Sequence, residues 1–233
     1  MREIVLDTET TGLDPNSGHK IVEIACVELK NHMPTGRHFH HYLNPQRDMP
    51  AEAFKVHGLS TEFLSAFGLF ESIAGPFLDF IETSPLVIHN AGFDMKFLNY
   101  ELRHAGFPAL NKHPIIDTIP LARKAFPGAQ VNLDALCRRF KIDLAAREKH
   151  GALLDAQLLA EVYLELKGGK QHGMVFMNTG HNIAGKSEVL GEETASKKLW
   201  PVRVFPLTAQ EQAEHATFMA KYPKALWHQL KND

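Results

Sequence analysis

Two carboxylates near the start of the chain have the spacing needed to bind a metal ion. Asp7 and Glu9 follow the apolar residues 4–6 and are separated by one residue. If this segment is a strand, both side chains point to the same face of the sheet. Two acids on one face of a buried strand repel each other, and desolvation is costly for each, unless a cation lies between them. The alternative is that the strand has already ended and both acids are solvated turn residues.

Asp155 provides the strongest argument from the residues themselves. The Leu- and Ala-rich segment 152–166 is expected to be a helix, and Leu159, Val162 and Leu166 share the face of Asp155. An unpaired acid on the apolar face of a helix destabilises the fold, so a purely structural role is disfavoured. The alternatives are a buried ion pair and a favourable interaction with the helix dipole.

Asp94 and His150 complete a pattern that has few accidental matches. Asp94 follows a short apolar segment at the expected start of a helix, where an acid can also serve as a cap. His150 precedes Asp155 by five residues, and a neutral His can accept a proton from water. The chain has 14 His residues, so His150 gains its interest from the neighbouring acid. His38, His40 and His41, with no carboxylate or Cys nearby, are interpreted as a surface face of a strand.

The segments that must position these residues alternate between strand and helix patterns. Strands are expected at 4–9, 21–29, 37–43, 86–89 and 115–117, and helices after residue 90, around 121–126, at 133–140 and at 152–166. Ser60 or Thr61 is a candidate helix N-cap. Short turn-rich connections join the first three strands into an antiparallel meander, and the later strands alternate with helices. The sequence therefore predicts one mixed α/β sheet with an antiparallel and a parallel side.

The character of the chain changes at residue 168. Residues 169–196 contain Gly, Asn and Ser without a sustained period, which predicts a flexible linker. Residues 197–233 contain Trp and Phe and a capping box at 208–211 that opens a short helix. Because this segment is too small to fold alone and too apolar to remain solvated, we expect it to dock on a partner.

Charge and composition restrict the class of function. The net charge is −2, whereas a protein that holds duplex DNA by itself usually has a basic excess. Either nucleic acid is not the substrate, or another protein delivers it. The two cysteines, Cys26 and Cys137, are expected to be buried thiols in a reducing cytoplasm. No apolar segment has the length of a membrane span, and the N-terminus is strand-like and does not look like a signal peptide.

Three segments resemble the motifs of the DEDDh exonucleases: residues 7–12 (DTETTG), 89–94 (HNAGFD) and 150–155 (HGALLD). The similarity is closest to the family of proofreading (epsilon) subunits of bacterial DNA polymerase III, which residues 56–58, 132–137 and 153–164 also resemble. It covers residues 1–168 well and the remainder more loosely. The sister class with Tyr in place of His is disfavoured, because Gly151 stands where that Tyr would be.

The resemblance implies an RNase H-like fold and a 3′→5′ exonuclease with two divalent ions, Mg²⁺ or Mn²⁺. Asp7, Glu9 and Asp155 would hold the ions, with Asp94 completing the site partly through water, and His150 would accept the proton of the attacking water. Two metal ions can activate water and neutralise the leaving 3′-oxyanion, and carboxylates suit Mg²⁺ or Mn²⁺ better than zinc. The product would be a 5′-mononucleotide.

The resemblance also implies binding sites outside the acids. The residues expected to line the pocket for the terminal nucleotide of a DNA 3′ end are Thr10, Thr11, Leu13, His57 and Asn90. Gln171, Met174 and Phe176 resemble the short peptide by which replication proteins bind the sliding clamp, although six-residue matches arise easily by chance. Residues from about 197 onward would bind the polymerase alpha subunit. Tethering at the replisome in the bacterial cytoplasm would then explain the absence of a basic excess.

Two alternatives use the same residues differently. A free-standing member of the superfamily would trim RNA or oligoribonucleotides with identical acids, and comparing mismatched DNA primers with short RNA discriminates between the two. A non-catalytic scaffold joining polymerase and clamp would keep the fold without the reaction, and a metal-dependent nuclease assay decides that case.

Overall fold

A mixed five-stranded sheet forms the centre of the first of two compact units. The computed structural model describes residues 1–144, 149–169 and 207–221, and the last of these ranges belongs to the second unit. The strands are β1 (Arg2–Thr10), β2 (Ile21–Lys30), β3 (Met33–Tyr42), β4 (Leu86–Ile88) and β5 (Ile115–Asp117), in the spatial order β3-β2-β1-β4-β5. β1, β2 and β3 pair antiparallel, whereas β4 runs parallel to β1 and β5 parallel to β4. The predicted RNase H-like α/β sheet is therefore confirmed.

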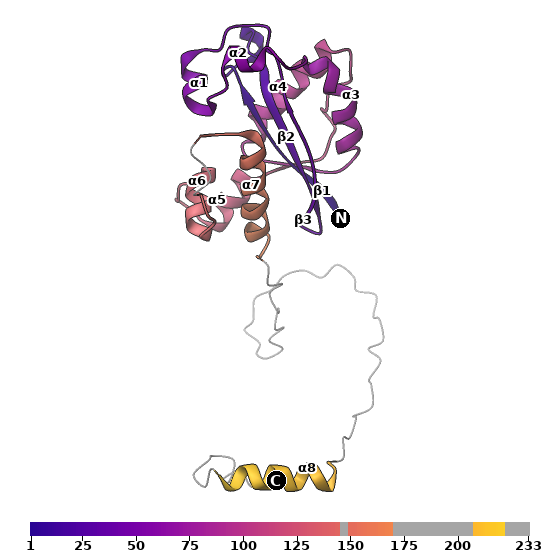
Figure 1. The fold of residues 1–233 in the computed structure, drawn as a ribbon, viewed down its shortest axis with the longest axis vertical. Helices are drawn as coiled ribbons and strands as arrows, with labels where there is room; N and C mark the ends of the chain where they lie inside the picture. The colour runs from indigo at the N-terminus through magenta and orange to yellow at the C-terminus, as the bar shows by residue number, and fades with distance from the viewer. Residues whose placement is uncertain (145–148, 170–206, 222–233) are drawn as a thin grey trace, which may run out of the picture. The chain divides into compact units, whose positions relative to one another are not determined.

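Helices α3 (Phe70–Ile81) and α4 (Ala91–His104) pack on one face of this sheet, and α5 (Thr118–Ala125), α6 (Leu133–Phe140) and α7 (Ala152–Leu166) lie on the other (Figure 1). The short helices α1 (Ala51–His57) and α2 (Thr61–Leu64) lie at one end of the sheet, and a 3₁₀ turn is formed by Pro15–Ser17. The predicted cap at Ser60 is confirmed, since its side chain accepts a hydrogen bond from the Phe63 N–H at the start of α2. The sequence patterns gave no prediction of α1 or α3.

Alternate residues of β1 contribute to different hydrophobic cores. Ile4 and Leu6 pack in the core that includes α3 and α4, whereas Val5 packs in the core that includes α6 and α7. This alternation follows from the strand period of two. Asp7 and Glu9 continue the series of Val5, so they face the side of the sheet on which α7 packs. The predicted common face of the two acids is thus confirmed.

The described part of the second unit is helix α8 (Ala209–Ala220). The predicted capping box is present: Thr208 Oγ1 accepts from the Glu211 N–H, and a Glu211 carboxylate oxygen accepts from the Thr208 N–H. Apart from residue 169, the predicted linker 169–196 lies outside the described residues. So do the clamp-like residues Gln171, Met174 and Phe176, and most of the predicted docking segment 197–233. None of the described helices is long and apolar enough to cross a membrane.

Candidate active site

The predicted site residues come from three elements that meet near one end of the sheet. Asp7 and Glu9 lie at the end of β1, Asp94 lies in the first turn of α4, and Asp155 lies in the first turn of α7. Asp94 and Asp155 are each only 4% exposed. Parallel packing explains this arrangement: β1 and β4 run in the same direction, so α4, which follows β4, begins beside the end of β1.

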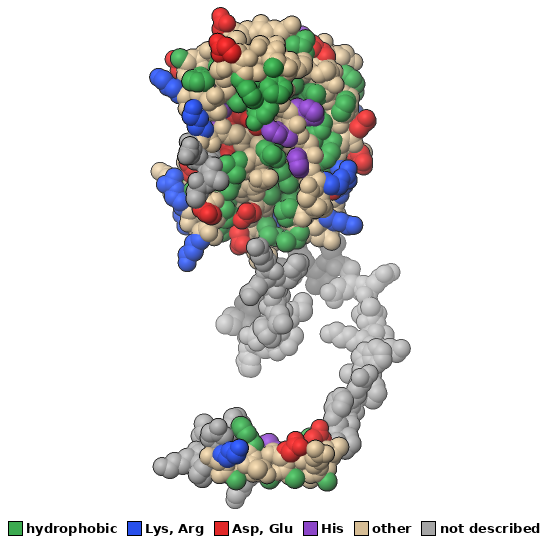
Figure 2. Space-filling view, viewed as in Figure 1, with side chains coloured by type: hydrophobic (Ala, Val, Ile, Leu, Met, Phe, Trp, Pro, Cys, Tyr) green, Lys and Arg blue, Asp and Glu red, His purple; other side chains and the backbone are tan. Residues whose placement is uncertain are grey.

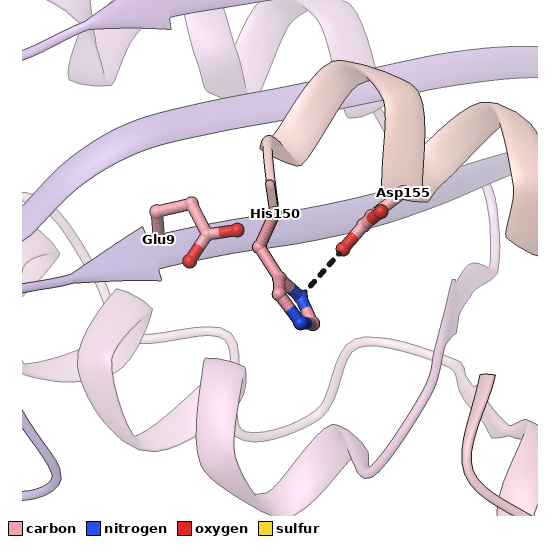
Figure 3. A group of neighbouring side chains, drawn as sticks. All are labelled: Glu9, His150 and Asp155. Atoms are coloured by element: carbon pink, nitrogen blue, oxygen red, sulfur yellow. Dashed lines mark hydrogen bonds and ion pairs between the residues drawn. The ribbon is translucent and has the colours of Figure 1, made fainter. Parts of the chain in front are cut away.

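Glu9, His150 and Asp155 form a compact group that is suited to holding a cation. One possible ligand atom from each lies within 4.8 Å of the others. Figure 3 shows the three side chains directed towards one another from β1 and the start of α7. His150 Nδ1 lies 3.1 Å from Asp155 Oδ2, and the His150 side chain is 48% exposed. The group therefore joins two buried acids to an imidazole that solvent can reach.

The electrostatics of Asp7 indicate a site that lacks positive charge. Burial raises the pKa of Asp7 well above its ordinary value, and the carboxylates of Asp94, Glu9 and Asp155 raise it further. Glu23, which lies opposite Glu9 on β2, adds to the same effect. Hard oxygen ligands that destabilise each other's ionised form suit Mg²⁺ or Mn²⁺, because the cation offsets both the desolvation and the repulsion. The donor set thus fits the divalent metal on which this class of exonuclease depends.

Asp94 has a dedicated hydrogen-bond donor on the strand beside it. Burial raises the pKa of Asp94 to about 7, while the hydrogen bond from Thr8 lowers it. Thr8 Oγ1 donates to Asp94 Oδ1 over 2.7 Å. Asp117, at the end of β5, accepts from the N–H groups of Asn90 and Ala91 and so fixes the start of α4. Thr8 and Asp117 were not predicted as site residues; for Asp117 the available signal was an acid at a strand end that caps the following helix.

A pocket of about 580 Å³ adjoins the acids. Its lining includes four of the five residues predicted to bind the terminal nucleotide: Thr10, Thr11, Leu13 and His57. Asn90 is not in the lining; it is the exposed N-cap of α4 in the left-handed conformation, with φ 67°. The apolar lining residues Val56 and Phe93 were not predicted. The structure therefore brings together most of the predicted substrate residues and leaves Asn90 out.

The Thr-Thr-Gly segment at the mouth of this pocket is shaped by His19. Thr11 Oγ1 lies 3.1 Å from His19 Nδ1 and accepts from the Lys20 N–H over 3.0 Å. The His19 ring lies against Gly12, where any side chain would overlap it. Gly12 is thus required for the close approach of a ring, which places a second imidazole in the pocket wall.

His57 is a buried residue in the wall of the same pocket. Its Nδ1 accepts from the Leu59 N–H over 3.1 Å, so the neutral ring carries its proton on Nε2. Burial lowers the pKa of His57, which favours this neutral form, while the Thr10 backbone acts in the opposite direction. His57 Nε2 is inaccessible to solvent, and the ring is held between the Leu59 N–H and the end of β1.

The histidines of β3 are outside the group of predicted site residues, with one correction to the sequence analysis. His38 and His41 are exposed, as expected of a surface strand face. A carboxylate does lie nearby, however: His40 Nε2 is 2.7 Å from Glu23 Oε1 on β2. The sequence does not reveal this pair, because the antiparallel register of β2 and β3 brings the two residues together.

Fold and acidic site together define an exonuclease domain, and residues 4–163 match the exonuclease family model (RNase_T). The chain belongs to the DNA polymerase III subunit epsilon family. It is 47% identical over 230 residues to the subunit from Rickettsia conorii, covering 97% of this chain and 99% of that protein. It is 44% identical over 221 residues to the Escherichia coli subunit, covering 92% and 90%.

Solved exonuclease structures share the fold at low sequence identity. Exonuclease X in complex with 5′ overhanging duplex DNA aligns with a TM-score of 0.55 at 24% identity, over 70% of this chain and 89% of that one. Escherichia coli exonuclease I in complex with a dA16 oligonucleotide gives a TM-score of 0.60 at 14% identity, over 71% and 40%. These structures show the shared fold, while the predicted family is confirmed by the family model and the epsilon-subunit relatives.

Proposed function

We propose that this chain removes nucleotides from DNA 3′ ends, one at a time, to proofread for a bacterial replicative polymerase. The observation that carries the proposal is the set of carboxylates that surround Asp7 and raise its pKa beside a pocket of about 580 Å³, which Glu9 helps to line. Asp7, Glu9 and Asp155, with Asp94, would hold two ions, Mg²⁺ or Mn²⁺. When bound, the ions supply the charge that activates water and stabilises the leaving 3′-oxyanion.

The side chains around the metal site have separate tasks in this proposal. His150 accepts a proton from the attacking water, and its exposure lets it pass that proton to solvent. Thr8 holds Asp94 in one orientation through their hydrogen bond. The product is a 5′-mononucleotide.

The pocket provides a place for the terminal nucleotide. Val56 and Phe93 supply apolar surface for a base, while Thr10, Thr11 and His57 supply polar residues in the wall. Leu13 is 82% exposed at the edge of the pocket, an unusual position for Leu that an unpaired base would cover. Such a site takes a single frayed nucleotide in preference to a paired one.

An exonuclease assay tests the catalytic proposal. A 5′-labelled single strand with Mg²⁺ or Mn²⁺ is expected to shorten from its 3′ end with release of 5′-mononucleotides. Asp7→Ala or Asp155→Ala is expected to lower the rate on the order of 10³-fold or more, since each variant removes a metal ligand. An unchanged or raised melting temperature shows that the fold is intact. Full activity in either variant would exclude the assigned site, and faster trimming of short RNA than of mismatched DNA primers would favour the RNA-trimming alternative.

The polymerase and clamp contacts rest on the tail of the chain. Tethering raises the local concentration of primer ends, so the enzyme needs little affinity for DNA of its own. Figure 2 agrees with this: on the face shown, Lys and Arg lie at the margins of the first unit, and hydrophobic and His side chains occupy the middle.

Deleting 169–233 is expected to preserve activity on short single strands and to abolish co-migration with the polymerase. Replacing Gln171, Met174 and Phe176 by Ala is expected to remove clamp binding alone. This activity belongs at the replisome in the bacterial cytoplasm.

A further inference from the structure

The segment that carries His150 is docked on helix α1. The His150 N–H donates to the Val56 carbonyl over 3.2 Å. The Lys149 ammonium lies 5.3 Å from the centre of the Phe54 ring. The Lys149 side chain also lies against Gly58, the residue that ends α1. A backbone hydrogen bond and one long side chain thus attach this segment to residues nearly 100 positions earlier.

Gly58 is required for this contact for two separate reasons. Its φ is +74°, in the left-handed region, and its N–H bonds back to Phe54 to cap α1. A Cβ at position 58 would also lie 2.7 Å from both Cδ and Nζ of Lys149. The first requirement is local and common to many helix ends, whereas the second exists only because Lys149 packs there. A cation at this position also interacts favourably with the C-terminal end of the helix.

The same helix forms one wall of the nucleotide pocket. Ala53, Val56 and His57 all line it. Val56 therefore has two contacts: its side chain faces the pocket, and its carbonyl holds the backbone of His150. Because the residues of one helical turn move together, a ligand that shifts or fixes α1 also shifts or fixes His150.

We infer that the Val56-His57-Gly58 segment and Lys149 position His150, and couple filling of the nucleotide pocket to placement of the general base. In this arrangement Gly58 and Lys149 are positioning residues and touch neither substrate nor metal. An empty pocket leaves α1, and with it the imidazole, without the support that the terminal nucleotide provides. This inference rests on the proposed role of His150 as the base.

Gly58→Ala tests the inference, with Gly106→Ala as the matched control. Gly106 has a φ of +79° and nothing within 4 Å of an added Cβ, so the backbone strain is shared and the clash with Lys149 is not. On a short single-stranded DNA with Mg²⁺, Gly58→Ala is expected to lower kcat about threefold, because the added Cβ displaces the Lys149 side chain from α1 and weakens the attachment of the His150 segment. KM is expected to stay within about twofold of the parent value. Equal kcat values in the two variants would overturn the inference.

A double-mutant cycle with His150→Ala shows whether Gly58→Ala lowers kcat through the imidazole or by disturbing the fold or the pocket. If Gly58 acts through the imidazole, Gly58→Ala has no further effect on the residual activity of His150→Ala. If instead it lowers that residual activity by the same factor as in the parent, the effect passes through the pocket or the fold, and the inference is wrong. Full activity of His150→Ala alone would refute the base assignment itself, which is a different failure.

Lys149 gives a second test that avoids the glycine. Lys149→Ala removes the contact with Gly58 and Phe54 but leaves the backbone bond to Val56, so a similar loss of kcat, about threefold, is expected. Lys149→Met keeps most of the apolar stem and is expected to recover part of that loss. The loss is again expected to vanish in the His150→Ala background. A Lys149→Ala variant with unchanged kcat, or with a loss that persists without His150, would contradict the coupling.

Discussion

Strand β1 and helix α7 carry acids at both ends of their contact, and the neighbours of these acids differ between the two ends. At the start of β1, Glu3 is fully buried, and its two oxygens lie 2.7 Å from the Tyr163 hydroxyl of α7 and 2.7 Å from His32 Nδ1. At the other end of the same two elements, Asp7 and Asp155 lie close enough for each charge to disfavour the other. Glu3 is stabilised by hydrogen bonds within the protein, whereas the acids at the other end would be stabilised by a bound cation.

The comparison shows that the structural acids have hydrogen-bond donors, whereas Asp7 lies among other acids. The hydrogen bond from Arg2, 2.6 Å away, keeps the pKa of Glu28 on β2 below its ordinary value. Asp7 has its pKa raised, by burial first and then by neighbouring acids. A cation bound among these acids would offset both effects, which agrees with the site that the geometry of Glu9, His150 and Asp155 indicates.

Removing the hydroxyl that donates to Asp94 is expected to have the largest effect on this comparison. Thr8→Val keeps the shape of the side chain and deletes the hydrogen bond to Asp94 Oδ1. Asp94 then loses both its orientation and an interaction that lowers its pKa. We expect a loss of about 10–100-fold in apparent Mg²⁺ affinity, measured as the Mg²⁺ dependence of exonuclease rate. High Mg²⁺ should restore most of the rate; an unchanged Mg²⁺ dependence would show that Thr8 does not support the ligand.

The raised pKa of Asp94 predicts how the stability of the metal-free protein changes with pH. Folding raises the pKa of Asp94 from an ordinary 3.8 to about 7. Between these values the unfolded chain is ionised while the folded chain resists ionisation, so the metal-free protein loses stability as the pH rises from about 4 to 7. Divalent ions bind the ionised site of the folded state, and at 100 times Kd they add about 2.7 kcal/mol. The expected gain in melting temperature on adding Mn²⁺ is therefore larger at pH 8 than at pH 5.

Asp94→Asn is the control for that measurement. The amide has no charge to desolvate, so the metal-free variant is expected to be at least as stable as the parent at pH 8 and to lose most of the gain from Mn²⁺. A parent protein whose metal-free stability rises between pH 4 and 7 would contradict the assigned pKa shift, unless the Asn variant showed the same rise, which would place its cause at other groups.

The sequence predicted the parts of the site that depend on local periodicity. The bounds of β5, α6 and α7 agree with the structure, and the common face of Asp7 and Glu9 follows from the strand period alone. Asp155 was recognisable because an acid on an apolar helix face has no local explanation. It lies 4% exposed in the first turn of α7, as that argument requires.

The residues that the sequence missed are paired by tertiary contacts. Thr8 reaches Asp94 across 86 positions, and Glu23 meets His40 only through the register of β2 and β3. Gly58 is part of a motif in the sequence, and its left-handed conformation caps α1, but its contact with Lys149, 91 positions later in the chain, is set by tertiary packing. Asn90 remains a prediction: its place in a motif suggested a substrate residue, and the structure shows it as the exposed N-cap of α4 outside the pocket lining. Spacing along a chain carries no information on such pairs, because docking of separate elements decides them.

The smallest expected effect lies at the opposite end of the pair. Tyr163→Phe removes the hydroxyl that donates to Glu3 and leaves a buried carboxylate oxygen without that donor. We expect a loss of about 1–3 kcal/mol in the free energy of unfolding, measured by urea titration of the metal-free protein. The exonuclease rate well below the melting temperature is expected to stay within about twofold, because no group at this end touches the site. A large loss of rate with stability preserved would show that the two ends of α7 act on each other, and the division between a structural and a catalytic end would then fail.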